Sequence, residues 1–272
     1  AIAGVAIAAV AILSFVGLAG FVSTQGHQRD TKYAPKNVQE PYTLVFTDIQ
    51  SSTSLWARVP EDMGPALDSH HEIIRKLIKK HRGYEVKTIG DAFMIAFEDA
   101  DDAVGLCEEL QLTFFKHDWK TDAIDETYRQ LEQEALEEDP ATDKAISCHL
   151  PEVLYRTTWN GLRVRCGVHT GIGDIKFDEI TKGYDYYGNV PNVAARTEAV
   201  GNGGQICVTS FAAAELKKDI PMTNLGAVDL RGVTDPVEMF QIDAVAGRKF
   251  AGLRVEKGMD EEDLMSQTDG EG

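Results

Sequence analysis

Residues 85–97 have the sequence EVKTIGDAFMIAF, in which two short runs of apolar residues flank the pair Gly90-Asp91. A glycine–aspartate pair between two such runs is typical of a tight β-hairpin turn. Upstream, residues 42–48 have the sequence YTLVFTD, a β-branched and aromatic run that ends in an acid. This second stretch predicts a buried strand.

Helices are predicted on either side of the hairpin. Apolar residues recur at helical spacing over residues 64–81, where Gly83 should end the helix, and again over residues 100–115. A third helix is predicted over residues 190–200, with Pro191 in its first turn. Further strands are predicted at 162–170, 172–177, 183–187, 206–209, 227–230 and 237–242. Because strands and helices intermix, we expect an α+β fold, with an antiparallel-rich sheet flanked by helices in a ferredoxin-like or palm-type arrangement.

Composition limits the possible partners. The chain has 272 residues, 43% of them hydrophobic, and a formal net charge of −17. That charge argues against nucleic acid as a partner, because binding to its backbone requires a basic surface. An acidic protein can still bind a nucleotide through metal ions and a few placed cations. The four cysteines form no CxxC pair and predict reduced, buried thiols, and the doublet His70-His71 predicts a helix surface.

The N-terminal 22 residues carry no charge and no proline, and such a length of apolar helix can span a bilayer. Basic residues follow it, which predicts that the chain after the span faces the cytosol. We therefore expect a single-pass membrane protein with a transmembrane segment at 1–22, a juxtamembrane linker at 23–41 and a cytoplasmic domain at 42–245. We also expect an acidic tail, disordered in part, at 246–272.

A strongly acidic stretch interrupts the domain at about residues 121–160. It predicts an inserted acidic subdomain containing an exposed helix. The simpler interpretation, a solvated charged helix face, accounts for the same pattern.

Asp48 and Asp91 are the first candidate site residues. Asp48 ends the predicted strand at 42–48, and Asp91 lies at the hairpin tip. If these strands are neighbours, both carboxylates meet at one end of the sheet, where two Mg²⁺ ions would relieve their repulsion. Alternatively, Asp48 caps the next helix and Asp91 is an ordinary turn residue.

Lys87 is a charged residue within an apolar strand, where lysine is uncommon. It could contact a nucleobase acceptor or a carboxylate, or it could extend to solvent from an edge strand. Asn192 and Arg196 are four residues apart on a predicted helix and share a face. An amide beside a guanidinium can bind an oxyanion as charge develops. Asp185 precedes them on the incoming strand.

Three separated motifs resemble the class III nucleotidyl cyclases: FTDI at 46–49, KTIGDAFM at 87–94 and YDYYGNVPNVAAR at 184–196. The resemblance covers roughly residues 42–245. The insertion and the single predicted span resemble the receptor-type adenylate cyclases of trypanosomatid parasites.

This resemblance implies a role for each matching position. Asp48, Asp91 and the carbonyl of Ile49 match the contacts to two Mg²⁺ or Mn²⁺ ions. Lys87 and Asp185 match the pair that recognises adenine, which indicates ATP as the substrate. Asn192 and Arg196 match the transition-state pair. Arg231 matches the contact to the terminal phosphates. Arg231 stands where relatives carry a lysine, and Pro191 stands where a residue other than proline is usual.

The family also implies an assembly, because its active site lies between two catalytic domains. This chain carries both sets of residues, so two copies would form two equivalent sites. The expected function is an adenylate cyclase that converts ATP into cyclic AMP and pyrophosphate at a homodimer interface. The alternatives are a catalytically silent cyclase-like domain that binds nucleotide or a partner, and a palm-type polymerase enzyme, which would require a basic template surface.

Overall fold

The computed structural model describes residues 29–138 and 147–255. The predicted membrane span at 1–22, the start of the linker and most of the acidic tail lie outside these residues. Within the described residues, no helix is long and apolar enough to cross a membrane.

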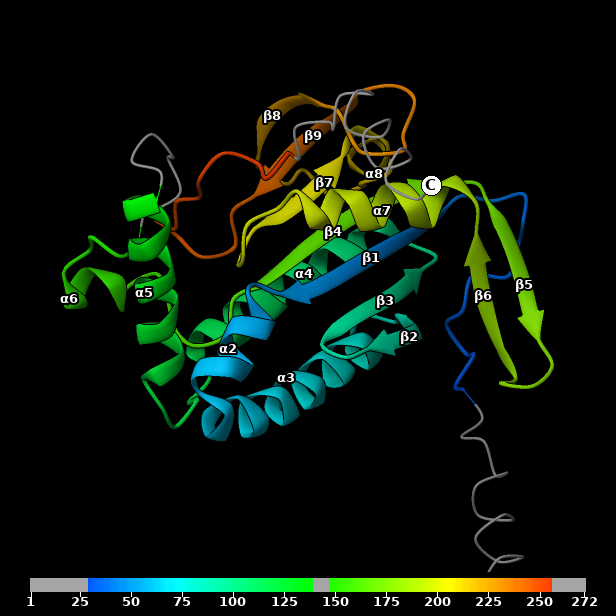
Figure 1. The fold of residues 1–272 in the computed structure, drawn as a ribbon. Helices are drawn as coiled ribbons and strands as arrows, with labels where there is room; N and C mark the ends of the chain where they lie inside the picture. Colours follow the sequence, from blue (N-terminus) through cyan, green and yellow to red (C-terminus); the bar gives the residue numbers. More distant parts are fainter. Residues whose placement is uncertain (1–28, 139–146, 256–272) are drawn as a thin grey trace, which may run out of the picture.

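A seven-stranded sheet forms the centre of the fold, in the order β2-β3-β1-β4-β7-β9-β8 (Figure 1). Its strands are β1 Tyr42–Ile49, β2 Tyr84–Ile89, β3 Ala92–Phe97, β4 Val164–Gly171, β7 Ile206–Thr209, β8 Met222–Val228 and β9 Val237–Ile242. Neighbouring strands are antiparallel except β4 and β7, which are parallel. The predicted α+β class is confirmed, and the sheet is mixed.

Helices cover both faces of this sheet. They are α2 Ser52–Arg58, α3 Pro60–Lys80, α4 Ala100–Lys116, α5 Ala123–Glu138, α6 Glu152–Tyr155, α7 Asn189–Ala199 and α8 Ser210–Ala214. Along β1, Val45 packs into the core cluster that contains α3 and α4, whereas Leu44 packs on the other face against the start of α7. Because successive strand residues point to opposite faces, each face of β1 buries its own set of apolar side chains. Figure 1 shows α7 lying across β4 and β1 in front, with α4 behind.

The predicted hairpin is present as β2 and β3. Gly90 has φ of +61°, a conformation that glycine adopts without steric cost, and it forms the two-residue turn with Asp91. Beside the hairpin, β1 pairs antiparallel with β3, from Thr43 opposite Phe97 to Thr47 opposite Phe93. The strand at 42–48 and the hairpin are therefore neighbours, which was the condition for the two aspartates to meet.

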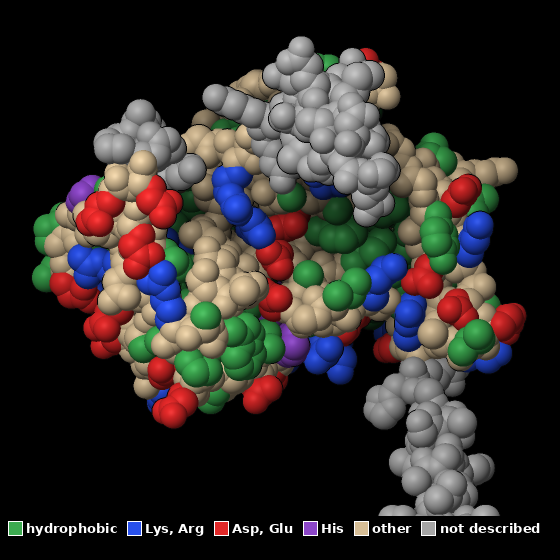
Figure 2. Space-filling view, viewed as in Figure 1, with side chains coloured by type: hydrophobic (Ala, Val, Ile, Leu, Met, Phe, Trp, Pro, Cys, Tyr) green, Lys and Arg blue, Asp and Glu red, His purple; other side chains and the backbone are tan. Residues whose placement is uncertain are grey.

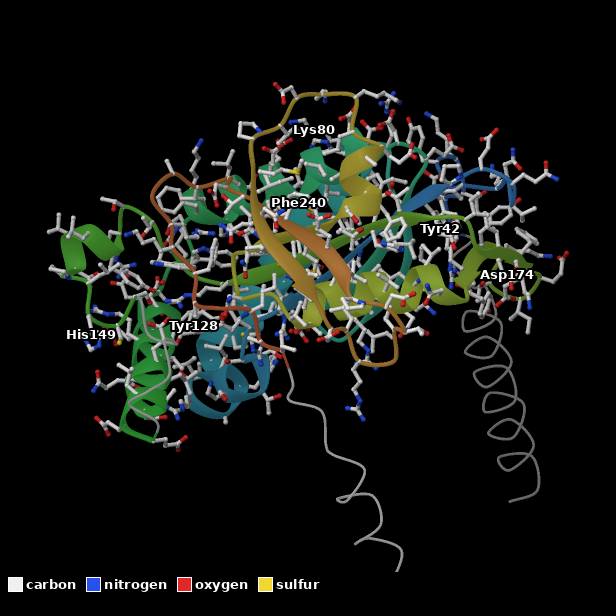
Figure 3. The ribbon with its side chains drawn as sticks, turned by 90° about the horizontal axis from the view of Figure 1, so that it is seen from above. Tyr42, Lys80, Tyr128, His149, Asp174 and Phe240 are labelled. Atoms are coloured by element: carbon white, nitrogen blue, oxygen red, sulfur yellow. The ribbon has the colours of Figure 1, made fainter. Side chains whose placement is uncertain are left out.

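A second, two-stranded sheet consists of β5 Asp174–Asp178 and β6 Gly183–Tyr187, and it projects beside the first described residues (Figure 1). Tyr186 joins it to the main sheet, with its ring centroid 4.9 Å from that of Tyr42. Burial and the negative charge of Asp174 raise the pKa of Tyr42 to about 12. Viewed from above, Tyr42 and Asp174 lie at one end of the molecule, opposite Tyr128 of α5 (Figure 3).

The acidic insertion is integrated into the main core. Ile124 and Tyr128 of α5 are fully buried within the same cluster as α3 and α4. Asp125 is also buried, and it accepts hydrogen bonds from Tyr155 at 2.6 Å and from the N–H of Gly161 at 2.9 Å. An acidic subdomain with its own core is therefore not seen in the described part of the chain, and one face of α5 is not solvated.

Three further expectations were wrong in detail. The helix predicted at 64–81 begins at Pro60, because proline is well suited to the first helical turn. The strand predicted at 227–230 is β8, which begins at Met222; Asn224 and Gly226 at its bulge conceal it in the sequence. His70 is fully buried rather than on a helix surface, because it lies one turn before Ile74 on the apolar face of α3.

Candidate active site

Asp48 and Asp91 lie at the same end of the central sheet. Asp48 lies near the end of β1, and Asp91 lies in the β2–β3 turn. The carboxylate of Asp91 accepts a hydrogen bond from the backbone N–H of Ile49 through Oδ2 at 3.3 Å. That contact places Asp91 beside the residue that follows Asp48. We call Asp48, Ile49 and Asp91 the metal half-site.

Arg165 is a neighbour of this half-site that the sequence analysis did not single out. It lies on β4 directly opposite Asp48 in the antiparallel register, and its Nη2 forms an ion pair with Asp48 Oδ2. Its Nε lies 2.5 Å from Oε1 of Glu198 on α7. The available signal was a second arginine in the apolar run LRVRCGV, residues 162–168. Such a residue is uncommon inside a strand unless it has a charged partner.

Glu198 connects α7 to the same end of the sheet. Burial raises the pKa of its carboxyl group to about 7, against the opposing effect of Arg165, and the negative charge of Asp48 adds to the rise. The guanidinium of Arg165 thus lies between the carboxyl groups of Asp48 and Glu198 and forms an ion pair with each. Arg165 is thus the cation that balances Asp48 in this structure.

The metal half-site fits hard divalent ions. Two carboxylates and a backbone carbonyl supply only oxygen ligands, and Mg²⁺ is usually held by one or two carboxylates together with substrate phosphates and water. Within residues 29–138 and 147–255, no group of three or more His, Cys, Asp or Glu side chains could hold a metal ion by itself. The donor set therefore suits ions that arrive with a phosphate ligand better than a permanently bound structural metal.

The α7 helix carries Asn192 and Arg196 one turn apart, as expected. It begins at Asn189, so Pro191 lies in the first turn, where a backbone N–H has no partner within the helix. The side-chain amide of Asn192 donates to the carbonyl of Gly232 at 3.4 Å. This contact brings the turn that carries exposed Arg231 beside α7. Asn192, Arg196 and Arg231 therefore belong to one region of the surface.

In the described part of the chain, Lys87 and Asp185, which we call the adenine half-site after their expected role, are not joined to each other by any contact of the kind that links Asp91 to Ile49. Lys87 is exposed on β2, the edge strand of the sheet, and a bulge between Glu85 and Lys87 alters the direction of the strand there. Asp185 lies on β6, where its Oδ1 is 3.2 Å from Nη1 of Arg29. Among the described residues no hydrogen bond joins Lys87 to Asp185. The edge-strand position considered for Lys87 is thus correct, and its role in adenine recognition stays a prediction.

The surface around these residues mixes both signs of charge. On the face drawn in Figure 2, basic side chains stand among acidic ones rather than in a continuous basic area. An anionic ligand on this face would therefore contact a few separate cations.

A family model matches this chain over residues 34–244, and it describes the adenylate and guanylate cyclase catalytic domain. The chain belongs to this family. The match covers most of the predicted domain at 42–245 and confirms the resemblance carried by the three motifs.

Receptor-type adenylate cyclases of trypanosomatids are among the similar proteins. One from Trypanosoma equiperdum is 55% identical over 241 residues, which cover 86% of this chain and 51% of the relative. Receptor-type adenylate cyclase B of Leishmania donovani is 49% identical over 261 residues, covering 94% of this chain and 19% of the relative. The chain thus spans about half or less of the length of these relatives.

A solved structure gives the same fold. A chain described as a Trypanosoma brucei adenylate cyclase in its monomeric state is 49% identical, covers 84% of this chain and all of that chain, and has a TM-score of 0.82. A rhodopsin-guanylyl cyclase catalytic core with converted specificity, in complex with ATPαS, is 18% identical, with coverage of 75% and 96% and a TM-score of 0.54. This second likeness shows the fold alone.

Proposed function

We propose that this domain is an adenylate cyclase that converts ATP into 3′,5′-cyclic AMP and pyrophosphate. The observation that carries the proposal is the contact between Asp91 and the N–H of Ile49, which brings Asp91 beside the backbone of the residue that follows Asp48. Membership of the cyclase family supports the same reaction, as does the 55% identity to a receptor-type adenylate cyclase.

The reaction is attack of the ribose 3′-oxygen on the α-phosphorus, with loss of the 3′-hydroxyl proton and departure of pyrophosphate. Asp48, Asp91 and the Ile49 carbonyl would hold two Mg²⁺ or Mn²⁺ ions, which lower the pKa of the 3′-hydroxyl and offset charge on the phosphates. Asn192 orients the ribose, and Arg196 stabilises negative charge on the α-phosphoryl oxygens. Arg231 binds the terminal phosphates.

Arg165 would contribute to substrate binding if its ion pair with Asp48 were replaced by a contact with the substrate. In the structure it balances Asp48. With divalent ions held by Asp48 and Asp91, the Arg165 guanidinium could bind a phosphate oxygen while its Nε stays paired with Glu198. Arg165 therefore exchanges an intramolecular partner for the substrate.

The complete site forms between two copies of the domain. Asp48 and Arg196 both belong to this chain, and a two-fold axis would place the α7 helix of each copy opposite the metal half-site of the other. The related T. brucei structures are described as monomeric. Weak self-association fits a domain that is held at high local concentration on a membrane.

We further propose that the predicted segment at 1–22 anchors the protein and that the catalytic domain faces the cytosol. The charge pattern of the sequence and the similarity to receptor-type relatives support this arrangement.

The test is production of cyclic AMP from ATP with Mg²⁺ or Mn²⁺, measured over a range of protein concentrations. A shared site predicts that activity per molecule rises with concentration. Nucleotide binding without turnover at any concentration would support the silent module instead, and polymerisation of nucleotides on a template would support the palm-type alternative.

A further inference from the structure

Arg29, in the linker that precedes the domain, contacts both strands of the adenine half-site. Its Nη1 lies 3.2 Å from Asp185 Oδ1, 3.4 Å from the Tyr84 hydroxyl and 3.5 Å from the carbonyl of Tyr184. Tyr84 begins β2, the strand that carries Lys87, and Tyr184 lies on β6. The Arg29 side chain is only 24% exposed, so it is packed between the strands rather than extended into solvent.

The junction between β2 and β6 has room for this arginine because residue 183 is glycine. A Cβ atom at Gly183 would lie 2.4 Å from Cδ of Arg29 and 2.7 Å from the Tyr84 hydroxyl oxygen. That hydroxyl also accepts from the N–H of Tyr184 at 2.8 Å and lies 3.1 Å from its carbonyl oxygen. Arg29 therefore occupies a defined position in the junction.

The contact leaves half of the Asp185 carboxylate available. Arg29 engages Oδ1, and no hydrogen-bond donor among the described residues reaches Oδ2. The exocyclic amine of adenine is a hydrogen-bond donor and needs a correctly oriented acceptor. A guanidinium hydrogen-bonded to one carboxylate oxygen limits rotation of the carboxylate group.

Arg29 and Lys87 also line the same cavity, which has a volume of about 810 Å³ and lies between α3, β2 and the linker. This volume is within the range of small-molecule sites. Asp185 does not line this cavity, and it does not contact Lys87. Arg29 contacts Asp185 and also lines the cavity beside Lys87, so it links the surroundings of the two residues.

We propose that Arg29 is a positioning residue for adenine recognition, acting through Asp185. The proposal rests on the proposed cyclase function. It makes the linker part of the specificity site, so that a shift of the linker changes nucleotide selectivity without touching the metal half-site.

The test compares ATP with purine riboside triphosphate, which lacks the exocyclic amine, in the 272-residue chain. Arg29→Ala should raise KM for ATP by roughly 5- to 10-fold with little change in kcat. For purine riboside triphosphate, the wild type and the variant should have similar KM values, because there is no amine to recognise. Arg29→Lys keeps a charge beside Asp185 and should recover part of the loss. The matched control is Arg82→Ala, which removes an arginine that pairs with Asp102 and should leave KM unchanged.

Three results would overturn the proposal. Equal losses with both nucleotides would mean that Arg29 has only a structural role. A lower KM for ATP in Arg29→Ala would mean that the linker competes with the base, and an unchanged KM would mean that it has no influence. Absence of cyclase activity in the wild type would instead reject the proposed function, so the two failures are distinguishable.

Discussion

The metal half-site and the adenine half-site differ in how the fold assembles them. Asp48 and Asp91 come from neighbouring strands of one sheet, and a hydrogen bond to Ile49 fixes their relation. Lys87 and Asp185 come from an edge strand and a separate hairpin, and they make no direct contact within the described residues. The half-site expected to carry the reaction is thus built within the central sheet, whereas the half-site expected to select the substrate combines the edge strand of that sheet with the separate β5–β6 hairpin.

Removal of a metal ligand should have the largest effect. We expect Asp48→Ala to lower kcat by at least about 10³-fold while the fold survives, because Arg165 keeps its partner Glu198. Cyclic AMP production and thermal unfolding measure the two properties. The exposed acid Asp219, beyond α8, gives a control in Asp219→Ala. Near-normal turnover in Asp48→Ala would remove the metal half-site from the mechanism.

Arg196→Ala tests the α7 helix, which we propose lies opposite the metal half-site of a second copy. Loss of a group that stabilises transition-state charge typically costs about 10²–10³ in kcat. We expect a loss of that size with a smaller change in KM, measured by steady-state kinetics. A raised KM with unchanged kcat would show that Arg196 only binds the ground state.

Simultaneous change of Lys87 and Asp185 to alanine should weaken substrate selection more than turnover. We expect the ratio of kcat/KM for ATP over GTP to fall at least about 10-fold, because the groups proposed to distinguish the two bases are gone. Parallel assays with the two nucleotides provide the measurement. An unchanged ratio would exclude both residues as specificity determinants.

The last expectation concerns the stability of the core rather than the activity. His70 packs between Phe93 and Phe114, neither of its ring nitrogens has a hydrogen-bond partner in the described residues, and burial lowers its pKa to about 3. The unfolded chain therefore binds a proton that the folded chain excludes between about pH 6.5 and pH 3. The contribution of His70 to stability should be fully present above pH 6.5 and should fall on acidification towards pH 3 by up to about 1.4 kcal/mol per pH unit.

Denaturant unfolding of His70→Leu across that pH range checks this expectation. The variant should lose less stability in acid than the wild type, whereas His149→Gln, a change at an exposed histidine, should follow the wild-type curve. Parallel curves for His70→Leu and the wild type would contradict the assignment.

Much of the central fold could be predicted from local patterns. The pair Gly90-Asp91 between two apolar runs predicted the hairpin, because a glycine–aspartate pair flanked by strand-forming residues is typical of a tight turn. The sequence predicted that Asp48 and Asp91 lie near each other if their strands are neighbours, and β1 does pair with β3. The start of β8 could not be predicted, because Asn224 and Gly226 have low strand propensity and only pairing with β9 holds them extended.

The sequence also did not predict the contacts of Arg165 across the sheet or the contact of Arg29 in the linker with Asp185. Arg165 was hidden because its partners Asp48 and Glu198 are remote in sequence, and the register of β1 against β4 brings the first of them to it. The burial of α5 was missed because its charge dominates the pattern, although Ile124 and Tyr128 are spaced one turn apart on its inner face. Sequence patterns report local structure, whereas these contacts depend on tertiary packing.

Complementation between two inactive variants tests the shared two-metal site most directly. Asp48→Ala and Arg196→Ala would each be assayed alone and then mixed in equal amounts, with cyclic AMP as the product measured. Random pairing of two-fold dimers places one intact site in half of the molecules, so the mixture should recover about a quarter of wild-type activity. Activity of the mixture no greater than the mean of the two variants would contradict a site formed by Asp48 of one copy and Arg196 of the other.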